Sequence, residues 1–183
     1  MNQANNKSET ALIAGIDALI RDVPDFPKPG IVFKDITPLL SNALHFAASI
    51  KFLADRCRAK DPQIVAGPEA RGFLFGVPVA MAIDTGFAPI RKKGKLPYRT
   101  IEESYELEYG KDTVAVHADA FSPGQKVILV DDVLATGGTM AASKRLVEKC
   151  GATVVGAVFL IELGFLDGRS RLDGLPIESL IRY

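Results

Sequence analysis

The sequence predicts an α/β protein with a mainly parallel, twisted sheet flanked by helices. Short apolar runs typical of strands alternate with helical patterns from residue 63 onward. Hydrophobic residues make up 48% of the 183 residues and charged residues 24%, which favours one packed domain and excludes global disorder. Lys and Arg number 22, as do Asp and Glu, so the net charge of 0 supplies no overall attraction to nucleic acid or acidic membranes. We therefore expect one soluble domain.

The N-terminal part reads as helix, loop and helix. Apolar residues recur at helical spacing over residues 9–20, which predicts an amphipathic helix. Residues 23–40 carry four prolines around Gly30 and cannot form one regular helix, although residues 31–36 favour a short strand. The helical pattern returns over residues 44–58.

The rest of the chain repeats a strand, a turn and a helix. Strands are expected at residues 63–66, 87–91, 126–130 and 153–161, and helices at residues 73–83 and 140–149. Parallel sheets of this kind bind ligands at the carboxyl ends of their strands. The turns at residues 67–72 and 134–139 should therefore lie on the same edge and carry the chemistry.

The stretch VILVDDVLATGGT, residues 127–139, is the most informative motif. A buried strand leads to Asp131 and Asp132, and two glycines then let backbone N–H groups approach a ligand at the start of a helix, which suits a phosphate monoester. The carboxylates would repel that phosphate, but they can accept hydrogen bonds from sugar hydroxyls, so the motif favours a ribose 5-phosphate. An ordinary strand-to-helix turn is the alternative. A nucleotide hydrolase is disfavoured because the chain has no GxxxxGK[ST].

These residues resemble the donor-binding motif of the type I phosphoribosyltransferases. PDFPKPGIVFKDITPLL, EARGFLFG, IRKKGKLP, SYELEYG and IEL resemble, in the same order, segments of the family members that act on adenine. The resemblance implies a type I phosphoribosyltransferase-like fold within one domain, residues 1–183, with a flexible flap at residues 92–111 and a base-binding hood from residues 24–40 and 160–183. It implies transfer of ribose 5-phosphate from 5-phosphoribosyl 1-diphosphate to adenine, giving AMP and diphosphate in purine salvage.

The resemblance also assigns roles to particular residues. Glu108 would be the catalytic general acid or base, with Glu106 as its rival. The donor would be bound by Asp131, Asp132, Ala135, Thr136, Gly137, Gly138, Thr139, Arg71, Lys92, Lys95 and Tyr109. Adenine would be bound by Val32, Phe33, Lys34 and Leu163. Mg²⁺ is expected through the donor and water, with no direct protein ligand assigned. The peptide bond between Glu69 and Ala70 is the candidate for a cis bond.

Two alternatives stay open: a transferase for another base, such as xanthine or orotate, and a non-catalytic regulator that senses the donor. A regulator would normally need a DNA- or RNA-binding element, and neither a helix-turn-helix nor a strongly basic surface is apparent in the sequence. The partners expected are adenine and the donor, without nucleic acid or membrane. The family implies a homodimer. Cys57 and Cys150 form no disulfide or zinc motif. The cytoplasm is expected because the first ten residues have no apolar core and uncharged stretches such as residues 72–83 are too short to span a bilayer.

Overall fold

The computed structural model describes residues 3–106 and 111–183. Its contacts divide the chain into two compact units, residues 1–52 and residues 53–183. The division falls inside helix α3, which runs from Ala43 to Arg58. The expectation of a single domain over residues 1–183 stays a prediction.

The first unit contains helix α1, a small antiparallel sheet, helix α2 and most of α3. The bounds are α1 Gln3–Asp17, β1 Arg21–Pro24, β2 Val32–Asp35 and α2 Thr37–Leu40. The expected N-terminal helix and the short strand are confirmed, although the helix ends at Asp17 rather than residue 20. Strand β1 pairs with β2 so that Val23 lies opposite Phe33. This strand was not predicted because its residues show no clear alternation next to the prolines.

The second unit is built on a sheet of seven strands in the order β5-β6-β4-β3-β7-β8-β9. Strands β4, β3, β7, β8 and β9 run parallel to one another, whereas β6 pairs antiparallel with both β4 and the edge strand β5. The bounds are β3 Ile64–Pro68, β4 Gly86–Lys92, β5 Thr100–Glu106, β6 Lys111–His117, β7 Lys126–Leu134, β8 Thr153–Glu162 and β9 Ile177–Arg182. The mainly parallel sheet confirms the predicted fold class.

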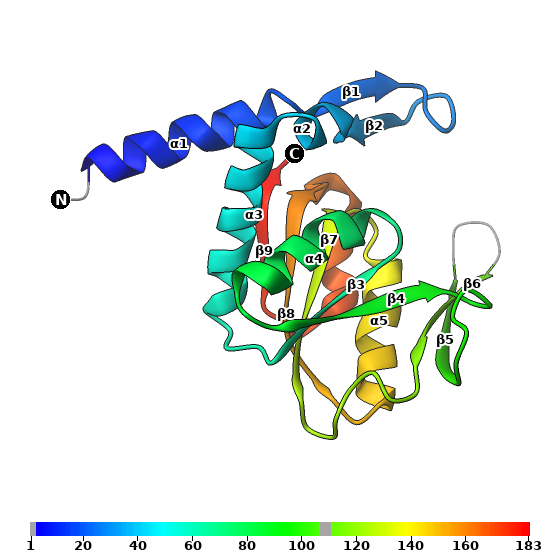
Figure 1. Ribbon diagram of the computed structural model, residues 1–183. Helices are drawn as coiled ribbons and strands as arrows, with labels where there is room; N and C mark the ends of the chain where they lie inside the picture. The colour runs from blue at the N-terminus through cyan, green and yellow to red at the C-terminus, as the bar shows by residue number, and fades with distance from the viewer. Residues whose placement is uncertain (1–2, 107–110) are drawn as a thin grey trace. The chain divides into compact units, whose positions relative to one another are not determined.

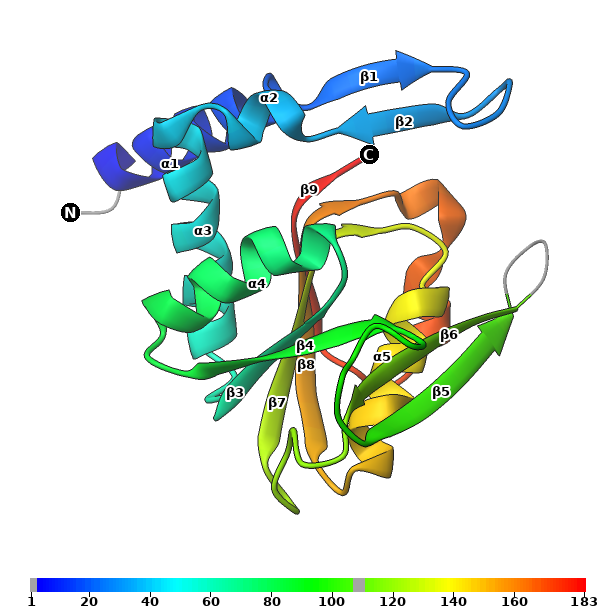
Figure 2. The ribbon, with the colours of Figure 1, turned by 45° about the vertical axis from the view of Figure 1, so that its right-hand side comes forward.

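Helices α4, Arg71–Ala82, and α5, Gly138–Lys149, lie on opposite faces of this sheet (Figures 1 and 2). In β7, Val127 and Leu129 pack into the same core cluster as Leu146 of α5. Ile128 and Val130, the alternate residues of β7, are also fully buried. A strand covered on both faces is apolar at successive positions rather than at every second one, which explains the run VILV. None of the helices among the described residues is long and apolar enough to cross a membrane.

Strands β3 and β7 separate at the edge where the predicted turns lie. Their pairing ends where Ala66 meets Leu129. Strand β7 continues past this point because β8 still pairs with it, up to Leu134 opposite Glu162. Diverging neighbours of this kind open a crevice at the carboxyl edge of a parallel sheet. Asp131 and Asp132 lie in the part of β7 that borders this opening, inside the strand rather than after it as expected.

Candidate functional site

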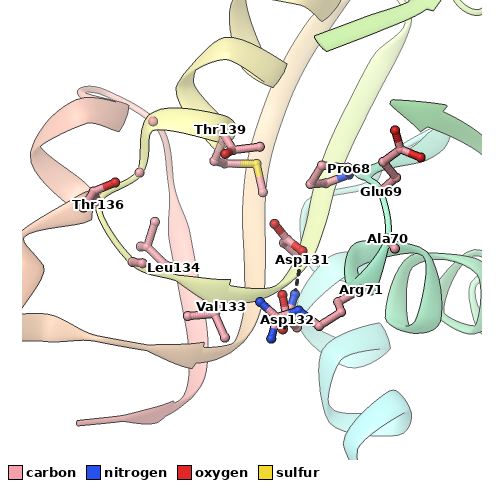
Figure 3. A pocket seen from close by; sticks show the side chains of 14 residues that line it. Pro68, Glu69, Ala70, Arg71, Asp131, Asp132, Val133, Leu134, Thr136 and Thr139 are labelled. Carbon is pink, nitrogen blue, oxygen red and sulfur yellow. Dashed lines mark hydrogen bonds and ion pairs between the residues drawn. The ribbon is translucent and has the colours of Figure 1, made fainter. Parts of the chain in front are cut away.

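A cavity of about 260 Å³ lies at the carboxyl ends of β3 and β7. It brings together the two turns that the sequence placed on one edge (Figure 3). Its lining comprises Pro68, Glu69, Ala70, Arg71, Asp131, Asp132, Val133, Leu134, Ala135, Thr136, Gly137, Gly138, Thr139 and Met140. All the donor-loop residues expected from the motif therefore face one space.

The loop between β7 and α5 is shaped by close backbone contacts. Gly137 has a φ of 78°, a left-handed conformation that side chains other than glycine rarely adopt. A Cβ atom at Gly137 would lie 2.4 Å from the carbonyl oxygen of Gly168, and one at Gly168 would lie 2.2 Å from that of Ala135. The segment around Gly168 thus holds the loop from behind. The loop leads into the first turn of α5, where unpaired N–H groups and the helix dipole favour an anion.

Asp131 and Asp132 occupy the floor of the cavity with unequal environments. The Oδ1 atom of Asp131 accepts a hydrogen bond of 2.9 Å from the backbone N–H of Asp132. Burial, together with the neighbouring charge of Asp132, raises the pKa of Asp131 well above its ordinary value. Burial also raises the pKa of Asp132, although the ion pair with Arg71, at 3.0 Å from Nε to Oδ2, opposes this. Both carboxyl groups can accept or exchange hydrogen bonds with a hydroxyl-bearing ligand.

The turn after β3 forms the opposite wall. The peptide bond between Glu69 and Ala70 is cis, as the resemblance led us to expect. The Glu69 carboxylate accepts hydrogen bonds from Arg91, at 3.0 Å from Nε and 2.9 Å from Nη2, and from the backbone N–H of Lys92 at 2.6 Å. Although burial opposes it, these donors hold the pKa of Glu69 below its ordinary value. Glu69 therefore ties the turn to the end of β4.

A second cavity of about 260 Å³ adjoins the first, since Pro68, Glu69 and Thr139 line both. Its other lining residues are Ile90, Arg91, Lys92, Tyr105, Asp112 and Val114. The Lys92 ammonium pairs with the Asp112 carboxylate at 3.2 Å. The expected donor-binding residue Lys92 thus lies beside the donor loop, in a neighbouring space.

Comparison with known proteins agrees with this geometry. The family described as "Phosphoribosyl transferase domain" matches residues 37–173. An adenine phosphoribosyltransferase of Desulfitobacterium hafniense (strain Y51) is 58% identical over 167 residues, which are 91% of this chain and 96% of the relative. The chain belongs to the adenine phosphoribosyltransferase family.

Solved structures named as adenine phosphoribosyltransferases share the fold. The enzyme from Thermoanaerobacter pseudethanolicus has a TM-score of 0.91 at 53% identity, over 93% of this chain and 99% of that one. The enzyme from Saccharomyces cerevisiae, solved with D-DIAB and adenine, has a TM-score of 0.87 at 37% identity, over 93% of this chain and 99% of that one. These findings confirm the resemblance and the fold class that the sequence indicated.

The remaining expected site residues are dispersed. Lys95 is exposed and lines neither cavity, while its carbonyl oxygen accepts a 3.0 Å hydrogen bond from Arg91. Leu163 follows β8 and donates its N–H to the carbonyl oxygen of Leu134 at 2.9 Å. The expected adenine-binding residues Val32, Phe33 and Lys34 belong to β2 in the first unit. Glu108 and Tyr109 lie outside the described residues.

Sequence reasoning missed a buried anchor behind the loop between β7 and α5 of this phosphoribosyltransferase. Glu162, 2% exposed, accepts hydrogen bonds from Arg169 at 2.7 Å and 2.6 Å and from Ser179 at 2.7 Å. The Arg169 guanidinium is the main reason that the pKa of Glu162 falls to about 2. Arg169 belongs to the 3₁₀ helix η2, Gly168–Leu172, whose Gly168 contacts the loop. The sequence does contain both charged residues, Glu162 in IEL and Arg169 in GRSRL, but it does not show that they pair.

The replacement Glu162→Gln should lower stability in a pH-dependent way. The folded pKa of about 2 lies below the ordinary value of 4.5, so the ionised form stabilises the fold above pH 4.5 and this contribution is lost as the pH falls toward 2. We expect the variant to lose about 2–3 kcal/mol of unfolding free energy at pH 7, and this deficit to shrink by about 1 kcal/mol at pH 3.5. Urea unfolding at both values measures it.

The matched control for this experiment is Glu148→Gln. Glu148 pairs with Lys144 on the surface of α5 at 2.9 Å, an ordinary pair four residues apart. Such pairs contribute at most about 1 kcal/mol, so this variant should stay close to the parent at both pH values. A deficit in Glu162→Gln that is equal at pH 7 and pH 3.5 would contradict the assigned pKa.

Proposed function

We propose that this protein transfers ribose 5-phosphate from 5-phosphoribosyl 1-diphosphate to adenine, producing AMP and diphosphate in purine salvage. The observation that carries the proposal is the cavity that unites Asp131 and Asp132 with the loop Ala135–Thr139, in a chain that belongs to the adenine phosphoribosyltransferase family. Relatives over most of the chain are named for this activity. The chain is thus a pentosyltransferase.

The 5′-phosphate of the donor binds to the loop from Ala135 to Thr139. Backbone N–H groups at the start of α5 supply hydrogen bonds, and the hydroxyl groups of Thr136 and Thr139 add two more donors. Asp131 and Asp132 accept hydrogen bonds from the ribose hydroxyls. This division of roles follows from charge, because a carboxylate repels a phosphate but accepts a proton from an alcohol.

Breaking the bond between C1′ and the diphosphate oxygen leaves positive charge on the ribose ring and negative charge on the diphosphate. Arg71 in the cavity wall, with Lys92 at the end of β4 and Lys95 after it, attracts the departing diphosphate. The ion pairs of Arg71 with Asp132 and Lys92 with Asp112 keep these cations near the crevice. The electron pair of the broken bond leaves with the diphosphate.

Adenine attacks C1′ through N9 and must release a proton as the new bond forms. Glu108 exchanges a proton with the base, or hydrogen-bonds to it, and Tyr109 contacts the donor; both roles rest on the SYELEYG resemblance. By the same resemblance, Phe33 would stack on the purine, and Val32, Lys34 and Leu163 are the other residues assigned to adenine. Phe33 already packs edge-on to Phe26 with 5.3 Å between ring centres, so its ring has support.

Mg²⁺ would be held through the donor and water, with no direct protein ligand assigned. Among residues 3–106 and 111–183, no group of three His, Cys, Asp or Glu residues is placed to hold a metal ion. A hard cation of this kind prefers oxygen ligands, and the donor's diphosphate and hydroxyl oxygens together with water fit it. When bound, Mg²⁺ would neutralise charge on the diphosphate. Asp131 and Asp132 add negative charge nearby.

We also propose that the protein is a homodimer in the cytoplasm. Helix α4 carries the apolar residues Leu74, Val77 and Met81 at helical spacing, and these are 42%, 40% and 74% exposed. Such a stripe fits a subunit interface. Cys57 and Cys150 are both free, in keeping with a reducing compartment.

The function is tested by giving the purified protein the donor, Mg²⁺ and one base at a time. Adenine should yield AMP and diphosphate, whereas hypoxanthine, guanine, xanthine and orotate should yield little nucleotide. Sedimentation of the same sample should report a dimer. A different preferred base would replace the assigned substrate, and donor binding without any product would favour the regulator.

A further inference from the structure

Tyr105 of β5 lines the second cavity and lies next to the loop Ala135–Thr139, which is the proposed phosphate site. Its side chain is 9% exposed, and its hydroxyl lies 3.1 Å from Oγ1 of Thr139 and 3.4 Å from Oδ2 of Asp112. That same Asp112 oxygen pairs with the ammonium of Lys92 at 3.2 Å. A continuous chain of polar groups therefore runs from Thr139 to Lys92, and the sequence reasoning assigned no role to its two middle members.

A phenol has one proton to donate, so Tyr105 can donate to Thr139 or to Asp112 but not to both. Burial raises the pKa of Tyr105, which keeps this proton in place near neutral pH. If Tyr105 donates to Asp112, the Tyr105 oxygen is the one acceptor for the Thr139 proton among these four polar groups. If Tyr105 donates to Thr139 instead, the Thr139 proton becomes available for another acceptor.

Asp112 does not depend on Tyr105. Its Oδ1 atom accepts the backbone N–H of Thr113 at 2.8 Å, and Lys92 balances its charge. Although burial opposes it, these donors hold the pKa of Asp112 below its ordinary value. The Asp112 carboxylate therefore keeps two partners when it loses the longer contact with Tyr105. The free-energy cost of turning the Tyr105 hydroxyl toward Thr139 is then small once an anion binds at Thr139.

We propose that Tyr105 is a positioning residue whose hydroxyl turns from Asp112 to Thr139 when the donor's 5′-phosphate occupies the loop, so that Thr139 donates its proton to the phosphate. The inference rests on the proposed donor site. It gives Tyr105 no contact with the donor: its effect passes through Thr139. It also couples phosphate binding to Lys92. When the Tyr105 hydroxyl turns away, Asp112 Oδ2 keeps its ion pair with Lys92 but loses its contact with Tyr105.

The test compares Tyr105→Phe, Thr139→Val and the double variant by steady-state kinetics and by calorimetric binding of ribose 5-phosphate. Tyr105→Phe should raise the donor KM and the Kd of ribose 5-phosphate about three- to tenfold, the effect of one hydrogen bond. The adenine KM and kcat should stay within about twofold. The double variant should be no worse than Thr139→Val, because Tyr105 acts only through the hydroxyl that valine lacks.

Ser104→Ala is the matched control. Ser104 precedes Tyr105 on β5, and its hydroxyl lies 2.9 Å from that of Thr113 across the same strand pair. Removing it deletes a hydroxyl contact of similar length that does not reach the loop. The donor KM of this variant should match the parent, and an increase equal to that of Tyr105→Phe would show a general effect of the strand pair and overturn the proposal.

Asp112→Asn supplies a second route that leaves Tyr105 intact. An amide nitrogen in place of Oδ2 donates to the phenol instead of accepting from it, which turns the Tyr105 proton toward Thr139. Because this change also removes the carboxylate that pairs with Lys92, the readout is the Kd of ribose 5-phosphate, which lacks the diphosphate that Lys92 attracts. This Kd should stay equal or fall, and a rise would overturn the inference. Thr139→Val with an unchanged donor KM would refute the donor site, whereas Thr139→Val with a raised KM beside a normal Tyr105→Phe would refute only the link.

Discussion

Gly137→Ala is expected to raise the donor KM about 100-fold and to lower the free energy of unfolding by about 2–4 kcal/mol. The φ of 78° disfavours any residue with a Cβ by about 1–2 kcal/mol. The new methyl group would also lie 2.4 Å from the carbonyl oxygen of Gly168, a backbone atom that cannot rotate away. The loop must shift to relieve this contact, and the N–H groups that we propose as the phosphate site shift with it. Donor kinetics and urea unfolding measure the two effects.

Gly151→Ala is the control that separates the cost of the left-handed backbone from the steric clash of the new methyl group. Gly151 ends the turn after α5 with a φ of 81°, but a Cβ atom there would meet nothing nearer than Pro123 at 3.8 Å. This variant should carry only the cost of the left-handed backbone, about 1–2 kcal/mol, and keep the parent donor KM. A normal donor KM in Gly137→Ala, with ribose 5-phosphate still bound at the parent affinity, would show that these amides do not bind the phosphate.

The parts of this site that could be predicted from the sequence are those in which neighbouring residues act together. Asp131, Asp132 and the loop through Thr139 follow one another along the chain, so their residue types alone predict a strand, a tight turn and a candidate anion site. The structure places them around one cavity. The parallel sheet was likewise predictable, because alternation of apolar runs with helical patterns is a local signal.

The supporting contacts could not be predicted, because they join residues far apart in the sequence. Gly168 of η2 contacts Gly137 although β8 lies between them in the sequence, and Tyr105 lies 34 positions before its partner Thr139. Strand β7 also extends to Leu134, beyond its predicted end at residue 130. Two aspartates would stop a strand in a local reading, but pairing with β8 continues past both. Tertiary pairing overrides local preference here.

Strand β9 was missed for a related reason. Its residues Ile177–Arg182, IESLIR, do not alternate regularly between apolar and polar types, and most are only half-buried at the edge of the sheet. A short edge strand with one covered face gives a weak pattern. Its place in the sheet still matters, because Ser179 of β9 donates to the Glu162 carboxylate that anchors η2.

Glu108→Gln is expected to lower kcat by about 100- to 1000-fold while changing the KM of either substrate only a few-fold. Glutamine keeps the shape and can still hydrogen-bond, but it cannot exchange a proton with adenine as N9 loses its own. An effect on turnover without an effect on binding identifies a group that acts in the transition state. Rapid-quench measurement of a single turnover should show the same loss, since the slowed step is the bond-forming one.

Glu106→Gln and Glu102→Gln test whether the position or merely the charge matters. Glu106 lies two residues before Glu108, on the same face if the strand continues, and is its direct rival. Glu102 lies on β5, where its carboxylate pairs with Lys93 at 2.8 Å, so replacing it removes one negative charge from the same segment. Both variants should keep turnover within about threefold of the parent. If turnover collapsed in Glu106→Gln and survived in Glu108→Gln, the proton would pass through Glu106, and the register of the SYELEYG resemblance would be wrong by one strand repeat.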